Sequence, residues 1–298
     1  MSLKQNKIIA ERLREAAALL KLQRANRYRV AAYRKAADTL ESLRQDIGLI
    51  FHTEGFEGLT MLPGIGPQIA AAIAEMIRTG QWTQLQRLRG KHDPEALFTQ
   101  VPGVGEELAR RLANDLHLDT LEALEMAAHD GRLMTVQGFG PRRIAIVRAA
   151  LAEMLARRPG NLLRVEEPPV HVVLDVDREY REKAAANKLR VIAPRRFNPR
   201  NEAWLPILHT ERGQWHFTAL FSNTALAHNL GHTRDWVVLY FQSDSHLEGQ
   251  RTVVTETRGS LTGERVVRGR ESECVEYYEL LGSETSNKES CSHSPTHA

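Results

Sequence analysis

Three short glycine turns hold the residues best suited to chemistry in this sequence. They read LPGIG at 62–66, VPGVG at 101–105 and VQGFG at 136–140, at spacings of 39 and 35 residues. Glycine allows backbone conformations closed to other residues, and the helix after such a turn presents unpaired amide groups. Those amides, with the positive end of the helix dipole, hold a phosphate oxygen without a charged side chain. The turns therefore predict binding to nucleic acid through its backbone, independently of base sequence.

The helices after the three turns begin with different residues. A proline opens the helix after the first and third turns, where proline is well tolerated, and two arginines add attraction for phosphate beside the third. Two glutamates come after the second turn and oppose an anion, so we expect the first and third turns to bind phosphate better. One such turn alone is more often a packing feature, but three copies favour DNA binding. The predicted phosphate-binding residues are Gly64, Gly66, Gln68, Gly103, Gly105, Gly138, Gly140, Arg142 and Arg143.

Helices must position these turns. Ile9, Leu13, Ala16 and Leu20 recur at the spacing that lines one face of a helix, and similar periodicity continues in pieces to about residue 158. The first half is therefore predicted to be all-α. Prolines and glycines at 157–170 then indicate a linker, which we place at 159–169.

Residues 170–281 are predicted to form a small α+β domain with a mostly antiparallel sheet. Six stretches are rich in β-branched and aromatic residues, as strands are: 170–176, 204–210, 214–221, 235–241, 251–257 and 264–269. Three helices are expected at 177–188, at 222–231 with Ser222 or Asn223 as its cap, and at 271–281. Residues 282–298 lack apolar periodicity and are expected to be disordered.

Composition narrows the class of protein. Of 298 residues, 42% are hydrophobic and 26% charged, which is typical of globular domains. Residues 1–160 hold 23 Lys and Arg against 18 Asp and Glu, a mild excess that favours a polyanionic partner. The sequence has no apolar run long enough to span a membrane and no secretory signal pattern, so a cytoplasmic protein without a membrane partner is expected, and its two cysteines are expected to be reduced.

A family resemblance covers roughly residues 5–158. The stretches YRVAAYRKAA, LPGIGPQIAAAIAEMI, VPGVGEELARRL, TLEALEMAAHDGRL and VQGFGPRRIAIV resemble the amino-terminal region of bacterial family X DNA polymerases. The resemblance implies a four-helix domain at 1–90 with the first helix-hairpin-helix, and a fingers-like helical domain at 91–158 with the other two.

In that family the first domain grips the 5′ phosphate of gapped DNA, and some members remove a deoxyribose phosphate through a lysine Schiff base. Here the position that resembles the lyase lysine is Ala72, and Gln68 stands where the phosphate pocket often has another lysine. Without an amine no Schiff base forms, so an enzyme is not favoured, although Lys35 is a candidate for a displaced lysine. The residues that match the basic and aromatic character of the neighbouring helix are Arg29, Tyr33, Arg34 and Lys35.

The second half gives no recognised active site. Asp175 and Asp177 have the spacing of a metal-binding pair on a strand, but Asp177 reads more simply as a helix cap, so the polymerase palm is expected to be absent. His228 and His232 form a weak candidate for a metal site, and His209 with His216 a candidate cross-strand pair. The aromatic residues here favour a packed sheet over base stacking.

The sequence therefore predicts a DNA-binding protein without cofactor, metal site or catalytic residue, acting in DNA repair. Duplex, gapped or 5′-phosphorylated DNA is the expected partner, and residues 170–281 are a candidate surface for a repair protein. Three alternatives stay open: a deoxyribose phosphate or abasic-site lyase, a nucleotidyltransferase-related enzyme with an unrecognised site, and a protein-binding scaffold.

Overall fold

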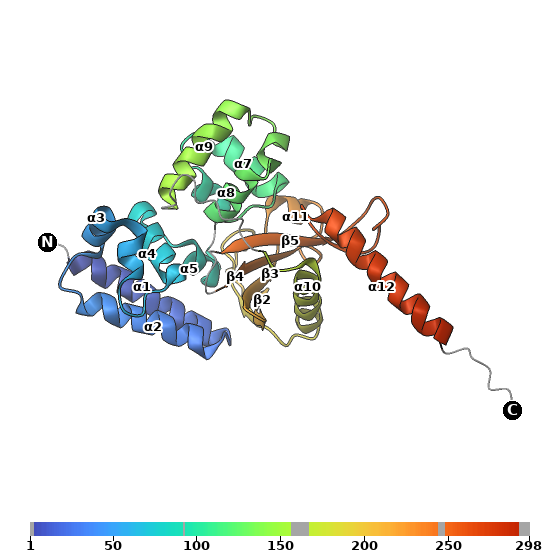
Figure 1. The fold of residues 1–298 in the computed structure, drawn as a ribbon, viewed down its shortest axis with the longest axis horizontal. Coiled ribbons are helices and arrows are strands. Elements are labelled where there is room, and N and C mark those ends of the chain that lie inside the picture. Colours follow the sequence, from blue (N-terminus) through green and yellow to red (C-terminus); the bar gives the residue numbers. More distant parts are fainter. Residues whose placement is uncertain (1–2, 92, 156–166, 244–247, 292–298) are drawn as a thin grey trace.

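The computed structural model describes residues 3–91, 93–155, 167–243 and 248–291 (Figure 1). Helices account for the regular structure as far as residue 155, and an antiparallel sheet with helices follows from residue 167. The predicted fold class, an all-α region followed by an α+β domain, is confirmed. Among the described helices, each is too short or too polar to cross a membrane.

A helical bundle forms the amino-terminal part of the molecule (Figure 1, blue to cyan). The predicted buried face of the first helix is confirmed, because Ile9, Leu13 and Leu20 are all buried. Asn26 caps the second helix by accepting a hydrogen bond from the Tyr28 amide, as polar residues commonly do at this position. The helices are α1 Leu3–Leu22, α2 Arg27–Ser42, α3 Ile47–Thr60, α4 Pro67–Thr79 and α5 Thr83–Leu88.

The second helical part, residues 93–155, green in Figure 1, has an apolar core of its own. Phe98, Leu112, Leu124 and Val147 lie at its centre and are fully buried. Its short elements cannot each bury enough apolar surface alone, so they depend on this shared core. They are α6 Pro94–Phe98, α7 Glu106–Asp115, α8 Leu121–His129, the 3-10 helix η1 Arg132–Thr135 and α9 Pro141–Met154.

The last part is built around a six-stranded sheet in which every strand pairs antiparallel with the strands next to it in sequence. The strands are β1 Arg190–Ile192, β2 Leu205–Arg212, β3 Trp215–Phe221, β4 Val237–Gln242, β5 Gly249–Thr255 and β6 Arg265–Val267. The helices are α10 Val170–Ala185, α11 Ala225–Asn229 and α12 Glu271–Cys291. The predicted aromatic core is present, since Trp215, Phe217, Phe221, Tyr240 and Phe241 are buried.

One predicted strand was wrong. Residues 170–176 form the first two turns of α10, which begins after Pro169, so Asp177 lies inside the helix and does not cap it. The β-branched content suggested a strand, but Val170, Val173, Leu174 and Asp177 are buried at helical spacing. Burial of this helix face against the sheet therefore outweighed the preference of β-branched residues for strands.

Smaller differences concern boundaries. Thr224, and neither Ser222 nor Asn223, caps α11 through a hydrogen bond from the Ala227 amide. The structure continues α12 to Cys291, where disorder was expected from residue 282, and residues 292–298 lie outside the described residues. Most of the predicted linker, up to residue 166, also lies outside them.

The amino-terminal bundle and the sheet share one continuous apolar core. The segment after α5 meets the segment after β1 at Gly90, whose carbonyl accepts a hydrogen bond of 2.7 Å from the Arg195 amide. Gly90 has φ +72°, and a Cβ atom on it would lie 2.5 Å from the Ala193 carbonyl oxygen. Only glycine allows this approach of two backbones.

We expect Gly90→Ala to lower the free energy of unfolding by at least about 2 kcal/mol, because it adds a backbone clash to the cost of a left-handed residue. Gly80→Ala is the matched control, since Gly80 has φ +68° with open space around it. Urea unfolding of the two variants measures the difference. Equal losses would show that the contact with Ala193 contributes nothing.

Candidate nucleic-acid interface

The three glycine turns share one backbone geometry. The first glycine of each turn adopts a positive φ: 75° at Gly64, 88° at Gly103 and 100° at Gly138. A residue with a side chain rarely adopts this conformation, which is why the sequence needs glycine at these three positions. The apolar residue after this glycine is buried each time and anchors the turn.

The second glycine of each turn is the N-cap of the next helix. Gly66, Gly105 and Gly140 are exposed, form no side-chain cap, and have open space where a Cβ would stand. The amide groups in the first turn of a helix have no acceptor within the helix. At these three N-termini no capping side chain competes with an incoming phosphate oxygen.

The second and third turns pack against each other's helices. A Cβ on Gly103 would lie 3.4 Å from Ile146 of α9, and a Cβ on Gly138 would lie 2.9 Å from Leu108 of α7. Arg111 of α7 donates a hydrogen bond of 2.6 Å to the Gln137 carbonyl of the third turn. This reciprocal contact makes the two hairpins one rigid unit, which we call the paired hairpins (residues 101–115 and 136–154).

Arginines surround the paired hairpins. Arg142 and Arg143 are exposed at the start of α9, and Arg143 also donates to the Gly138 carbonyl. On α7, Glu107 forms ion pairs with Arg110 and with Arg111, the second at 2.9 Å. The acidic character that the sequence indicated for the second turn is therefore partly neutralised within its own helix.

The first turn is less open than its sequence indicated. The Gln68 side chain donates a hydrogen bond of 3.0 Å to the Ser243 carbonyl, just after β4 in the sheet domain. The aliphatic part of Lys35 lies 3.0 Å from where a Gly64 Cβ would stand. The first hairpin therefore faces the sheet domain on one side and α2 on the other.

The four predicted residues of the neighbouring helix divide into two groups. Arg34 and Lys35 are exposed on α2, and Arg29 is half-buried. Tyr33 is only 3% exposed: its hydroxyl donates to Gln84 Oε1 at 2.8 Å, and its ring packs against Trp82 with centroids 5.5 Å apart. It is therefore a core residue, and it is not available to contact DNA.

The position that resembles the lyase lysine lies beneath the sheet domain. Ala72 is buried in a small pocket that Gln242 and Glu248 help to line. Glu75, one turn along α4, accepts hydrogen bonds from the Thr83 amide at 2.8 Å and from the Thr83 hydroxyl at 2.5 Å. Burial raises the pKa of Glu75 to about 7. The pocket thus offers the carboxyl groups of Glu75 and Glu248, and Lys35 lies exposed outside it.

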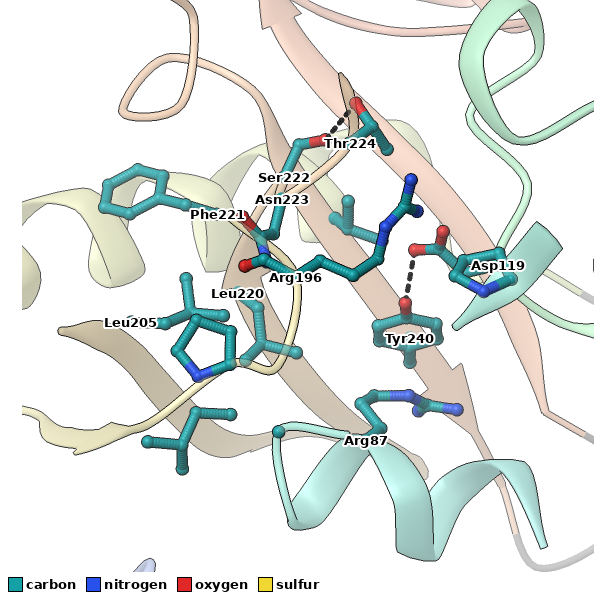
Figure 2. Close-up of a pocket in the computed structure, with 15 residues that line it drawn as sticks. Arg87, Asp119, Arg196, Leu205, Leu220, Phe221, Ser222, Asn223, Thr224 and Tyr240 are labelled. Carbon is teal, nitrogen blue, oxygen red and sulfur yellow. Dashed lines mark hydrogen bonds between the residues drawn. The ribbon is translucent and has the colours of Figure 1, made fainter. Parts of the chain in front are cut away.

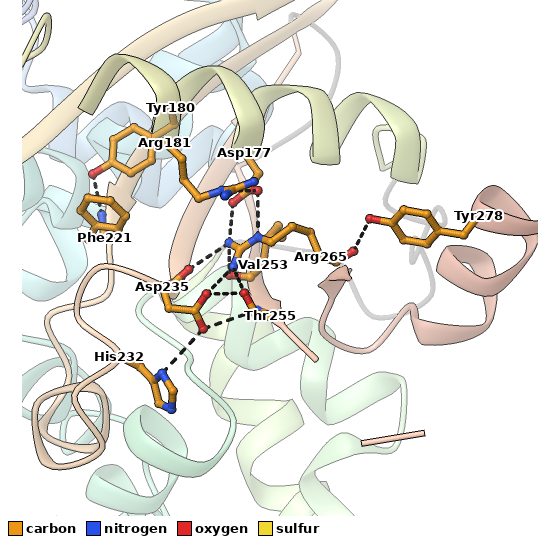
Figure 3. A network of polar contacts seen from close by, with 10 residues as sticks. All are labelled: Asp177, Tyr180, Arg181, Phe221, His232, Asp235, Val253, Thr255, Arg265 and Tyr278. Atoms are coloured by element: carbon orange, nitrogen blue, oxygen red, sulfur yellow. Dashed lines mark hydrogen bonds and ion pairs between the residues drawn. The ribbon is translucent and has the colours of Figure 1, made fainter. Parts of the chain in front are cut away.

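Asp175 and Asp177 do not form a metal-binding pair. Because they lie two residues apart on α10, they point to different sides of the helix. Asp175 pairs with Arg212 at 2.8 Å, whereas the fully buried Asp177 pairs with Arg265 at 2.7 Å (Figure 3). Arg265 also binds Asp235 at 2.6 Å, so its guanidinium joins α10 to the sheet.

The predicted histidine pairs are likewise separate. His228 contacts Asn223 at 2.6 Å, whereas His232 lies beyond the end of α11 and stacks on Trp236. The strand register places His209 opposite Thr218 and His216 opposite Glu211. Burial lowers the pKa of His209 to about 3. Within the described residues, His, Cys, Asp and Glu side chains form no group of three that could hold a metal ion.

A cavity of about 70 Å³ lies where the bundle, the second helical part and the sheet meet (Figure 2). Tyr240 of β4 points to Asp119 between α7 and α8 and donates a hydrogen bond of 2.5 Å to it. The guanidinium of Arg87 lies 3.4 Å from the centre of the Tyr240 ring. Burial raises the pKa values of both Asp119 and Tyr240. The cavity has room for only a few water molecules. The contacts of Tyr240 with Asp119 and Arg87 join the three parts of the protein.

Comparison with known families agrees with this geometry. Residues 4–82 match the family described as helix-hairpin-helix domain. Residues 56–117 and 95–153 match the family described as SAM-like helix-hairpin-helix tandem. The amino-terminal half of the chain therefore consists of helix-hairpin-helix domains.

The chain is also similar to the DNA polymerase/3′-5′ exonuclease PolX of Bacillus subtilis (strain 168), with 28% identity over 178 residues. The match covers 59% of this chain and 29% of that protein, so the chain spans less than a third of the relative's length. The predicted resemblance to family X polymerases is confirmed for the helix-hairpin-helix region. Together these matches support a DNA-binding protein related to that family.

Proposed function

We propose that this protein binds DNA without regard to sequence, through phosphate contacts at the paired hairpins. The observation that carries the proposal is the similar geometry of two adjacent turns, each ending in an exposed glycine N-cap without a capping side chain. Two such N-termini on one rigid unit bind two phosphates, and backbone amides read no base sequence.

The positive charge beside the third turn also supports DNA binding at the paired hairpins. Arg142 and Arg143 are exposed beside the third turn and form no ion pair with any described residue. They attract the phosphate backbone over several ångströms and release its counterions on binding. The third turn therefore contributes more than the second, where Glu106 and Glu107 stand at the helix start.

The first hairpin plays a secondary role in this proposal. Gln68 is tied to the sheet domain, but Arg34 and Lys35 remain exposed on α2 nearby. They supply attraction for a further phosphate, such as one at the 5′ side of a gap. We further propose that the protein binds gapped DNA in DNA repair, a role supported by the similarity to a protein named as a DNA polymerase and exonuclease.

A salt titration tests the proposal. We expect the affinity for a blunt duplex to fall steeply as salt rises, and Arg142→Gln with Arg143→Gln to reduce the slope of log affinity against log salt by about 2. The matched control removes two exposed positive charges elsewhere, with Lys4→Gln and Arg258→Gln. Fluorescence anisotropy with a labelled duplex gives both slopes. An affinity that does not change with salt, or a control with the same effect, contradicts phosphate binding at the third turn.

A further inference from the structure

A second basic surface lies away from the hairpin turns, at the junction of the three parts. It is a groove of about 410 Å³ between α1, the start of α6 and the segment after β1. We call it the junction groove. Its polar lining includes Arg12, Gln81, Gln86, Lys91, Asp93 and Arg195.

The acidic groups around the junction groove already have partners. Glu15 forms a bidentate ion pair with Arg89, and Glu95 forms an ion pair with Arg196 at 2.7 Å. Asp93 caps α6 by accepting from the Ala96 amide. Lys91 and Arg195, in contrast, are exposed and form no ion pair within 4 Å with any described residue. The groove therefore has an excess of positive charge.

An exposed aromatic ring stands two residues beyond Arg195. Phe197 is 47% exposed and has φ +54°, a conformation that costs energy for a residue with a side chain. The ring of His228 backs it, with centroids 4.3 Å apart. The Arg196 guanidinium lies 5.3 Å from the centre of the same ring, and the residue still keeps almost half of its surface open to solvent.

Hydrogen bonds hold this loop in place. The Asn198 side chain donates to the carbonyls of Pro194, at 2.9 Å, and Glu202, at 2.8 Å, and accepts from the Glu202 amide. The side-chain amide of Asn223 donates to the Arg196 carbonyl at 3.1 Å, and its Oδ1 atom lies 2.6 Å from His228 Nε2. The backbone on both sides of Phe197 is therefore held in place, which reduces the entropy lost when a partner binds.

We propose that the junction groove and Phe197 bind a single-stranded segment of DNA, with its phosphates on Lys91 and Arg195 and an unstacked base on the Phe197 ring. Positive grooves beside exposed aromatic rings bind single strands in this way, because every base has a face that can stack. Phe197 is the second residue after Arg195, a span of at most roughly 7 Å, which suits a phosphate and its neighbouring base. α11, which carries His228, contacts α7 of the paired hairpins, so this surface adjoins the helices to which we assign duplex binding.

Single-strand binding at the junction groove rests on the proposed DNA binding, and one set of DNA probes distinguishes it from duplex binding at the paired hairpins. Anisotropy of the full chain is measured with a blunt duplex of about 20 base pairs and with the same duplex carrying a tail of about eight thymidines, enough to fill a groove of this kind. We expect the wild type to bind the tailed duplex more tightly. Phe197→Ala should lower the affinity for tailed duplex about tenfold and leave that for blunt duplex unchanged, whereas Phe197→Trp should retain the gain.

Lys91→Gln with Arg195→Gln should likewise reduce only the tail-dependent affinity and lower its salt slope by about 1.4. The charge-matched control is Lys4→Gln with Arg258→Gln, since Arg258 lies between β5 and β6, at the opposite edge of the sheet from Arg195. Equal affinity of the wild type for the two probes, or unchanged tail binding by Phe197→Ala, overturns the inference. Tighter binding of an RNA tail overturns the assignment to DNA. Failure of blunt-duplex binding alone contradicts the proposed function and leaves this inference standing.

Discussion

Replacing Gly105 and Gly140 together by aspartate is expected to abolish measurable binding to blunt duplex DNA while the protein stays folded. Both glycines are helix N-caps in extended conformation with open space around them, so a side chain fits without strain. Aspartate is a preferred N-cap and should raise helix stability by a few tenths of a kcal/mol. Its carboxylate would occupy the amides that we assign to phosphate and would repel DNA.

The expected loss is at least about 100-fold, because each site loses a charge-assisted hydrogen bond of roughly 1.5–3 kcal/mol. Anisotropy at low salt measures it, and thermal unfolding verifies the fold. Gly66→Asp makes the same chemical change at the first hairpin, where Gln68 is tied to the sheet domain, and should cost less. Full affinity in the double variant would rule out the helix N-termini as the phosphate sites.

Arg265→Gln is expected to lower the free energy of unfolding by about 3–5 kcal/mol. It removes the more buried of the two arginine partners of Asp177, a carboxylate with no exposed surface, and leaves that buried charge with only the half-exposed Arg181. It also removes bonds to Asp235 Oδ1 at 2.6 Å and to the Val253 carbonyl at 3.2 Å (Figure 3). Replacing a buried ion pair as a whole costs much less than breaking it.

Urea unfolding of three variants measures this effect. Arg181→Gln removes the other, more exposed partner of Asp177 and should cost less than about 1 kcal/mol. Asp177→Asn combined with Arg265→Gln should recover part of the loss, because no unpaired carboxylate is left. A loss below about 1 kcal/mol for Arg265→Gln would mean that water reaches Asp177 in solution.

The hairpins could be predicted from sequence because their geometry is local. A positive φ at the first glycine, a buried apolar residue and a glycine N-cap all occur within five residues, and the structure has this arrangement three times. The absence of an amine at Ala72 was equally visible, since it depends on residue type alone.

The sequence-based predictions were wrong where contacts between distant parts of the chain determine the structure. Residues 170–176 have the β-branched content of a strand, yet they are helical because Val173 and Asp177 face the sheet. The more buried partner of Asp177 lies 88 residues away at Arg265, and no local pattern predicts that pairing. Tyr33 looked like a DNA-contacting aromatic in a basic helix, but Trp82 and Gln84 enclose it.

Residue types and their order were enough to predict three hairpins able to bind phosphate and an antiparallel α+β domain after them, because turn chemistry and strand composition act over a few residues. Folding in three dimensions determined which hairpins pair, what lies over Ala72, and how Lys91 and Arg195 come to line one groove. These arrangements depend on distant chain segments meeting at Gly90 and Arg195, and the close approach of two backbones there is invisible until the chain has folded.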